Sequence, residues 1–130
     1  MWSVGGATRI YLLAGVTDLR RGFDGLYGLV ESKLAEDPLS GHLFLFCNRN
    51  RTRLKGLIWD GSGLCVCVKR LDCGCFSWPQ ANAEGRGKVQ LSSQELALLV
   101  GGIELTGTRA KRWWRGRTQT SVESHIEKDR

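Results

Sequence analysis

The chain has 130 residues, of which 42% are hydrophobic and 25% charged, and its formal net charge is +6. This length suits one domain that folds without a disulfide or a metal, and the composition is ordinary for a globular protein. No apolar run is long enough for a membrane-spanning helix, and a pI near 9.4 favours polyanionic partners, nucleic acid ahead of an anionic membrane.

The first fifteen residues lack the basic start of a signal peptide, so no secretion signal is expected. Five cysteines are an odd number, which favours free thiols in a reducing compartment. The sequence therefore predicts a cytoplasmic protein.

The first half of the chain predicts two strands and a helix between them. Apolar residues over 8–14 indicate a strand, and residues 42–47 indicate a second one. A helix is expected over 20–35, with its N-cap at Thr17 or Asp18, because apolar residues recur there at helical spacing. Three glycines weaken this helix by propensity, and we interpret them as close packing against a sheet; they are Gly22, Gly25 and Gly28.

The second half predicts a strand meander and a second helix. Strands are expected over 53–60 and 63–71, joined by a hairpin turn, and two short strands follow at 75–78 and 88–91. A helix capped by Ser92 or Ser93 is expected over 93–101.

This order of elements predicts an α+β fold, in which an antiparallel sheet built around the meander carries two main helices. We expect one domain over residues 1–107. Residues 108–130 are polar and charged, which favours a basic C-terminal tail without stable structure.

Four of the five cysteines fall within eleven residues, which raises the question of a metal site. Cys65 and Cys67 are two apart in a predicted strand, whereas zinc ligands usually pair across a longer gap in a turn. Cys73 and Cys75 flank a turn glycine. Free cysteine also behaves as a small hydrophobic residue, so we expect no metal and no other cofactor.

Basic residues alternate with uncharged ones at the start of the meander. If the segment is extended, all four project from one side, which suits a phosphate backbone. A solvated hairpin edge explains the same pattern equally well. The four residues are Arg49, Arg51, Arg53 and Lys55.

A second basic cluster spans residues 109–117, where five cations flank Trp113 and Trp114. Cations beside exposed aromatic rings suit phosphate binding and base stacking, so Arg112 and Arg115 are candidate DNA contacts. Docking on a partner protein is the alternative.

No catalytic motif is present. The sequence lacks a nucleophile elbow, a phosphate-binding loop and a zinc-protease helix, and neither histidine has a partner at triad or metal spacing. A metal-dependent nuclease would need Asp18, Asp24 and Asp60 to converge. We expect a protein that is not an enzyme and takes no small-molecule substrate.

Two stretches carry a resemblance to a known family. Residues 14–30, AGVTDLRRGFDGLYGLV, and the meander over 41–79 are similar to small accessory proteins encoded by the second open reading frame of bacterial insertion sequence family sixty-six, often called TnpB. The resemblance covers about residues 5–105. It implies a role in DNA transposition beside a separate DDE-type transposase, with no catalytic activity of its own. The implied partners are insertion-sequence ends, the transposase and other element-encoded proteins, and no membrane.

The family motif contains several cations that would form one basic surface, namely Arg20, Arg21, Arg53, Lys55, Lys69 and Arg70. Phe23, Trp59 and Trp78 are interpreted as architecture. The alternative for the cations is that Asp18, Asp24 and Asp60 pair with some of the arginines and hold loops together. The chain departs from the family pattern at Gly56, Cys67, Cys73 and Cys75.

Overall fold

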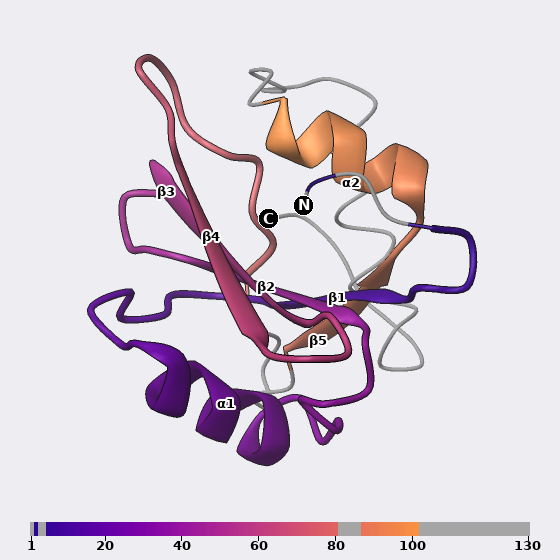
Figure 1. Cartoon of the computed structure of the whole chain (residues 1–130). Helices are drawn as coiled ribbons and strands as arrows, with labels where there is room; N and C mark the ends of the chain where they lie inside the picture. Colours follow the sequence, from indigo (N-terminus) through magenta and orange to yellow (C-terminus); the bar gives the residue numbers. More distant parts are fainter. Residues whose placement is uncertain (1, 3–4, 81–86, 102–130) are drawn as a thin grey trace.

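The computed structural model describes residue 2 and residues 5–80 and 87–101 of the chain. Five strands form one sheet in the order β4-β3-β2-β1-β5. Figure 1 shows α1 against one face of the sheet and α2 against the other. The elements are β1 (Ile10–Leu13), α1 (Phe23–Ser32), β2 (Leu43–Cys47), β3 (Arg53–Trp59), β4 (Leu64–Arg70), β5 (Lys88–Leu91) and α2 (Ser93–Val100).

The α+β class is confirmed, and most neighbouring strands are antiparallel. One pair is not: β1 and β2 run parallel, with Ile10 opposite Leu43. The reason is the connection between them, because α1 crosses over one face of the sheet and returns the chain in its starting direction. The meander β2-β3-β4 is antiparallel, as the turn at Asp60–Gly63 predicts.

The sheet is covered on both faces, and each face has its own apolar core. Tyr11, Phe44, Phe46 and Leu57 meet Leu26, Val30 and Leu34 on the α1 face. The opposite face packs residues of β1, β2, β3 and β5 with α2; its largest members are Ile10, Leu12, Leu43, Leu45, Leu54, Phe76 and Leu96. Because β2 lies between two layers, all five of its residues are buried.

Helix α1 is shorter than its apolar pattern predicts. It begins at Phe23 with Gly22 as its N-cap, so the predicted caps at Thr17 and Asp18 are wrong. Phe23 is 49% exposed, which also corrects its interpretation as architecture. The residues that anchor the helix lie one and two turns later, where Leu26 and Val30 are fully buried.

The glycines of α1 do not bring it close to the sheet. A Cβ atom added at Gly22 or Gly28 would meet no heavy atom within 4 Å, and one added at Gly25 would meet only the side chain of Arg21. The interpretation of these glycines as close packing is therefore wrong.

Gly28→Ala is expected to stabilise the protein, because alanine costs less backbone entropy in a helix and the added methyl group meets nothing. The free energy of unfolding should rise by about 0.5–1 kcal/mol in urea denaturation. Gly56→Ala is the control, because its Cβ would approach Trp2 to 3.0 Å and Leu43 to 3.3 Å, and it should lower stability. A destabilised Gly28→Ala variant would contradict this account of α1.

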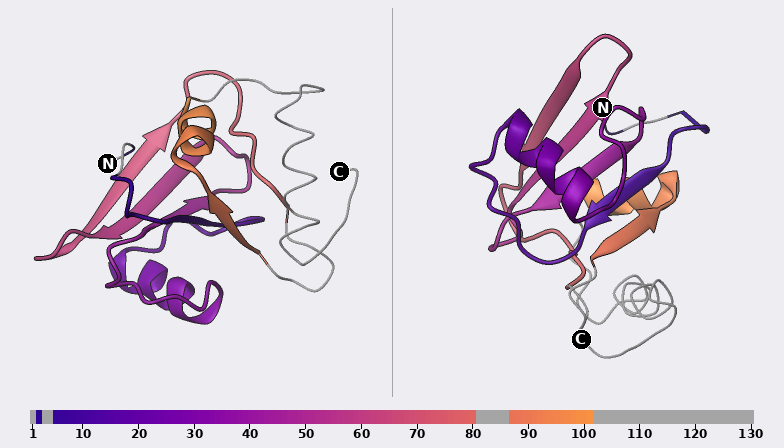
Figure 2. Two further views of the ribbon diagram at one scale, coloured as in Figure 1. Left: turned by 90° about the vertical axis from the view of Figure 1, so that its right-hand side faces the viewer. Right: turned by 90° about the horizontal axis from the view of Figure 1, so that it is seen from below.

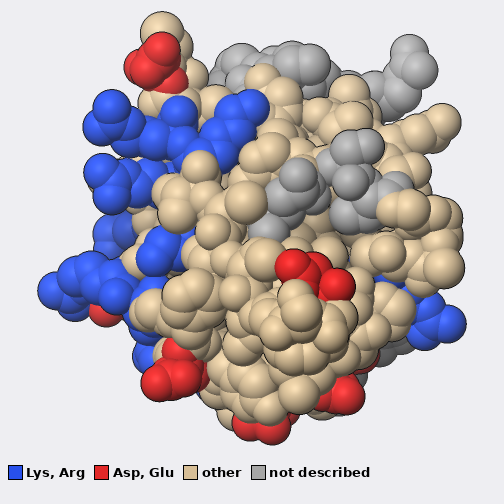
Figure 3. All heavy atoms as spheres, viewed as in Figure 1, with Lys and Arg blue, Asp and Glu red and all other residues tan. Residues whose placement is uncertain are grey.

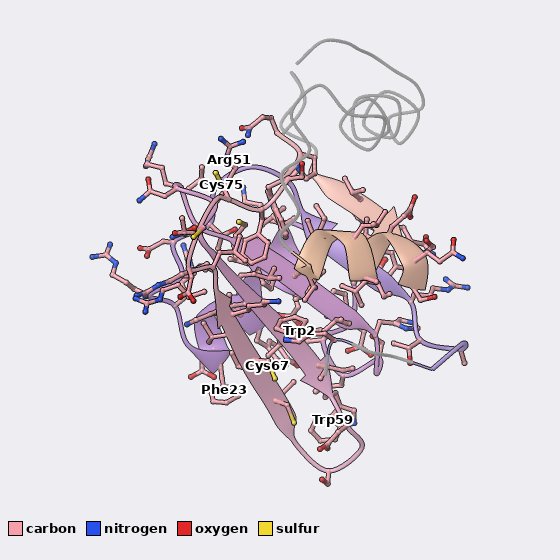
Figure 4. The ribbon with its side chains drawn as sticks, turned by 90° about the horizontal axis from the view of Figure 1, so that it is seen from above. Trp2, Phe23, Arg51, Trp59, Cys67 and Cys75 are labelled. Carbon is pink, nitrogen blue, oxygen red and sulfur yellow. The ribbon has the colours of Figure 1, made fainter. Side chains whose placement is uncertain are left out.

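Gly56, where the chain departs from the family pattern, has a packing role on the face of the sheet that carries α2. The indole of Trp2 lies over it, and Gly56 is paired with Cys67 on β4. Figure 4 shows Trp2 and Cys67 in the same part of the sheet. A glycine in a strand often marks a site where another group approaches closely, and here the group is Trp2.

Residues 75–78 are not a strand, so that prediction is wrong. The segment instead closes the edge of the α2-face core with Phe76 and Trp78, which are 1% and 4% exposed. The Trp78 indole nitrogen donates to the Leu13 carbonyl at 3.0 Å, and the Gly15 amide donates to the Pro79 carbonyl at 2.8 Å. These bonds replace the ladder that a strand would have formed.

Helix α2 matches its prediction. Ser92 caps it: the Ser92 hydroxyl accepts a hydrogen bond from the Glu95 amide, and the Glu95 carboxylate accepts one from the Ser92 amide. The predicted tail over 108–130 and the end of the predicted domain at residue 107 lie outside the described residues.

Candidate nucleic-acid interface

The turn between β2 and β3 aims basic side chains at one end of the sheet. The Asn48 side chain accepts from the amides of Thr52 and Arg53 at 3.0 and 3.1 Å, which closes the turn. Arg51 takes the left-handed conformation, with φ of 60°. The turn places Arg49 and Arg53 on the same side, next to the loop between β1 and α1.

A groove of about 910 Å³ lies between this turn, the β1–α1 loop and the ends of β3 and β4. Among the described residues that line it, five are cations and one is a carboxylate, Asp18. The cations are Arg20, Arg49, Arg53, Lys55 and Arg70. Figure 3 shows Lys and Arg side chains gathered in a band down the side of the molecule that carries these segments.

Two arginines of the groove lie directly opposite each other on neighbouring strands. Arg53 on β3 is the register partner of Arg70 on β4. The neighbouring pair Thr52 and Leu71 is hydrogen-bonded, with the Leu71 amide 2.9 Å from the Thr52 carbonyl. Since hydrogen-bonded and non-hydrogen-bonded pairs alternate, Arg53 and Arg70 form a non-hydrogen-bonded pair, the type with the closer side chains.

Like charges opposite each other destabilise a sheet. Among the described residues, neither Arg53 nor Arg70 has an ion-pair partner. The described residues therefore supply no carboxylate to relieve this repulsion, and an anion bound from solution would do so. This pair is the strongest sign that the groove serves binding rather than folding.

The one acid of the groove is already occupied. Asp18 accepts from the Arg20 guanidinium at 2.9 and 3.0 Å and from the Arg20 amide at 3.1 Å. These hydrogen bonds lower the pKa of Asp18 to about 2. The pair fixes the β1–α1 loop, so the alternative that arginine–carboxylate pairs hold loops together applies to Arg20 alone among the groove cations.

Lys55 joins two sides of the groove. Its ammonium donates to the Arg21 carbonyl at 3.1 Å, which ties the β1–α1 loop to β3. An ammonium has three donors, so two remain for a ligand.

The predicted cations outside the groove are Arg21, Arg51 and Lys69. Arg21 contributes its carbonyl, and its side chain lies over Gly25. Arg51 lies beside Cys75, as Figure 4 shows, and its carbonyl accepts from the Phe76 amide. The extended stripe from Arg49 to Lys55 is thus interrupted at the turn. Lys69 points to the opposite face and donates to the Val100 carbonyl at 2.7 Å. Arg112 and Arg115 lie outside the described residues.

Two exposed apolar residues of the groove could not be found from the sequence. Val16 and Val68 line it with exposed fractions of 53% and 55%. Thr17, between Val16 and Asp18 in the sequence, is buried, and its amide donates to the Cys47 carbonyl at 2.8 Å. Exposed valines beside cations offer a surface for the less polar parts of a nucleotide.

The three aspartates considered for a nuclease do not converge. Asp18 lies at the groove, near the start of β3, while Asp60 follows the end of that strand, roughly 20 Å away at ~3.3 Å per residue. Asp60 accepts from the amides of Ser62 and Gly63, both at 2.9 Å, which lowers its pKa to about 2. It shapes the β3–β4 turn.

All five cysteines are free thiols. Burial raises the pKa of Cys47 to about 12, and a hydrogen bond to Asp60 raises that of Cys65. Within the described part of the chain, no three His, Cys, Asp or Glu side chains are placed to hold a metal ion. No helix in that part is long and apolar enough to cross a membrane.

Similarity to known proteins identifies the family independently of the groove. Two curated proteins of Sinorhizobium fredii are similar, both named as uncharacterized: y4hO is 42% identical over 74% of this chain and 81% of its own length, and y4jC is 37% identical over 79% and 86%. No solved structure matches. The profile of the IS66 Orf2-like proteins matches residues 8–110. The chain therefore belongs to this family, which is associated with the transposition of insertion sequences in an accessory role.

Proposed function

We propose that this chain is a non-catalytic DNA-binding accessory protein, which assists a separate DDE-type transposase at the ends of an insertion sequence. The observation that carries the proposal is the Arg53–Arg70 couple, which has no carboxylate partner among the described residues and lines a groove whose one described carboxylate, Asp18, is already occupied. Phosphate oxygens bind arginine guanidinium groups through paired, charge-assisted hydrogen bonds.

The groove offers cations for the backbone and apolar surface beside them. Arg49, Arg53, Lys55 and Arg70 supply the charge that attracts phosphates of any sequence. Val16 and Val68 add contact area without base-specific hydrogen bonds. We therefore expect affinity for DNA with little sequence preference from this surface alone.

The test is the salt dependence of duplex DNA binding by the full chain, followed by fluorescence anisotropy. Four groove cations have no acidic partner in the described part of the chain, and they should give a slope of log K against log salt of roughly −4 or steeper. Affinity without this slope, or no affinity, would argue for the alternative, a subunit that docks on the transposase and contacts DNA little. Co-purification with the transposase distinguishes that case.

Asp18→Asn is expected to strengthen DNA binding about fivefold at 0.15 M salt, because it frees Arg20 for a phosphate and adds about one to the salt slope. The wild-type affinity should not change between pH 5 and 8 on account of Asp18. Its pKa of about 2 keeps it ionised throughout that range, and its charge is lost only as the pH falls through that value. Unchanged or weaker binding by the variant would contradict the role given to this carboxylate.

A further inference from the structure

Strand β4 is an open edge of the sheet. Its inner neighbour is β3, and the left view of Figure 2 shows no further strand beyond it. The hydrogen-bonded pairs at both ends of the β3–β4 ladder fix which groups face outward: the Asp60 amide bonds the Gly63 carbonyl, and the Leu71 amide bonds the Thr52 carbonyl. By alternation, Cys65, Cys67 and Lys69 bond to β3.

The backbone groups of the remaining residues of β4 point outward. These residues are Leu64, Val66, Val68 and Arg70. No described residue forms a hydrogen bond with these outward groups. The edge thus presents four amides and four carbonyls in register for another strand.

The edge also lacks the features that usually protect such strands. Five consecutive uncharged residues run from Leu64 to Val68 without proline, glycine or a bulge. The other edge of the sheet is protected, because β5 has only four residues and begins with Lys88, which pairs with Glu36. Among the described residues, β4 is therefore the unprotected edge of the sheet.

We propose that β4 pairs with β4 of a second copy, antiparallel and centred on Cys67, so that two sheets become one. This register is the one that uses the whole strand: Leu64 lies opposite the second copy's Arg70, and Val66 lies opposite its Val68. All four outward residues then form hydrogen-bonded pairs.

The charges of the strand select this arrangement. Lys69 and Arg70 stand at one end of β4. Antiparallel pairing on Cys67 separates the two Arg70 residues by roughly 20 Å along the sheet, at ~3.3 Å per residue, which exceeds the screening length of about 8 Å. Parallel pairing in register would place them side by side. Although each copy carries a net positive charge, antiparallel pairing keeps the two Arg70 residues apart, so it is favoured over parallel pairing.

The arrangement has a consequence for the groove. Antiparallel edge pairing is generated by a two-fold axis perpendicular to the sheet, which keeps the same face of both copies on one side. Val68 and Arg70 belong both to β4 and to the groove. The two basic grooves would therefore lie on one continuous face, as a shared surface for DNA.

The first test is the mass of the full chain in the absence of DNA, measured by light scattering or sedimentation over a concentration series. We expect a dimer that dissociates on dilution. Val68→Pro should give a monomer with an intact fold, because the amide it removes points to the open edge and proline is tolerated there. Val68→Lys is the second variant, and it should also be monomeric, because a lysine on an edge strand opposes pairing with another strand.

Two controls make the result decisive. Cys67→Pro removes an amide that bonds to β3, so it should lose thermal stability whereas Val68→Pro keeps it. A wild-type chain that is monomeric at every concentration, or a dimer that survives both Val68 variants, would overturn the proposal. A larger assembly that survives them would indicate a different interface. Because no DNA is present, failure here leaves the DNA-binding proposal standing.

The register has its own test by mild oxidation with diamide, which takes up the two thiol hydrogens as a disulfide forms. Cys67 would lie opposite its own copy in a non-hydrogen-bonded pair about 4.5 Å apart between Cα atoms, within disulfide range. A variant with Cys65, Cys73 and Cys75 replaced by serine should cross-link rapidly. In the matched variant, Cys65 is kept and Cys67, Cys73 and Cys75 are replaced by serine. This variant should not cross-link rapidly, since Cys65 would lie opposite Lys69 of the second copy. Equal rates would overturn this register.

Discussion

Replacing Arg53 and Arg70 together by glutamine is expected to weaken duplex DNA binding about 30-fold at 0.15 M salt and to reduce the salt slope by about two. The reason is the geometry of the groove: the two guanidinium groups come from directly opposed positions, without an acidic partner among the described residues. Fluorescence anisotropy of the variant and the wild type over a salt series measures both effects.

The matched control removes two positive charges elsewhere. Arg9 and Lys33 are exposed and do not line the groove, so their double glutamine variant has the same net charge with the groove intact. It should bind almost as tightly as the wild type. The Arg53 and Arg70 variant should be at least as stable as the wild type, because the substitution relieves a like-charge pair. Equal losses in the two variants would mean that only the net charge of the chain attracts DNA.

Phe44→Ala is expected to lower the free energy of unfolding by about 3–5 kcal/mol, a large part of the 5–15 kcal/mol typical of a domain. Phe44 is fully buried in the central strand, and its ring stacks on Tyr11 at 5.8 Å between centroids under α1. The cost comes from the lost burial and from the cavity left between two layers. Urea denaturation at fixed pH gives the value.

Phe23→Ala makes the same chemical change at the first residue of α1, where the side chain is 49% exposed. It should cost less than about 1 kcal/mol, since surface substitutions rarely cost more. If the two phenylalanine variants lost similar stability, the assignment of Phe44 to the core and of Phe23 to the surface would be wrong.

Most of the fold could be predicted from the sequence, because its strands carry strong local signals. The apolar run of β2, the turn at Asp60–Gly63 and the Ser92 cap each act within a few residues. The start of α1 could not be predicted in this way. Asp18 has a side chain that can cap a helix, but its carboxylate accepts hydrogen bonds from the Arg20 guanidinium instead. The helix therefore begins only at Phe23. The parallel pairing of β1 and β2 depends on the path of α1, which no local pattern encodes.

The sequence predicted several cations of the candidate site but not the groove that brings them together. Arginines at alternate positions suggested a stripe, yet the left-handed Arg51 turns away and Lys69 lies on the other face. The register of β3 and β4 brings Arg70 opposite Arg53. The β1–α1 loop, more than thirty residues before Arg53 in the sequence, completes the groove. Spacing along the chain predicts neither.

The central claim is that DNA occupies the groove, and the protection of Lys55 from chemical acetylation tests it most directly. Lys55 lines the groove, whereas Lys33 is exposed away from it, so both can be followed in one mass-spectrometric experiment. With saturating duplex DNA at low salt, the acetylation of Lys55 should slow several-fold while that of Lys33 stays constant. Acetylation of Lys55 at the same rate with and without bound DNA would contradict the claim.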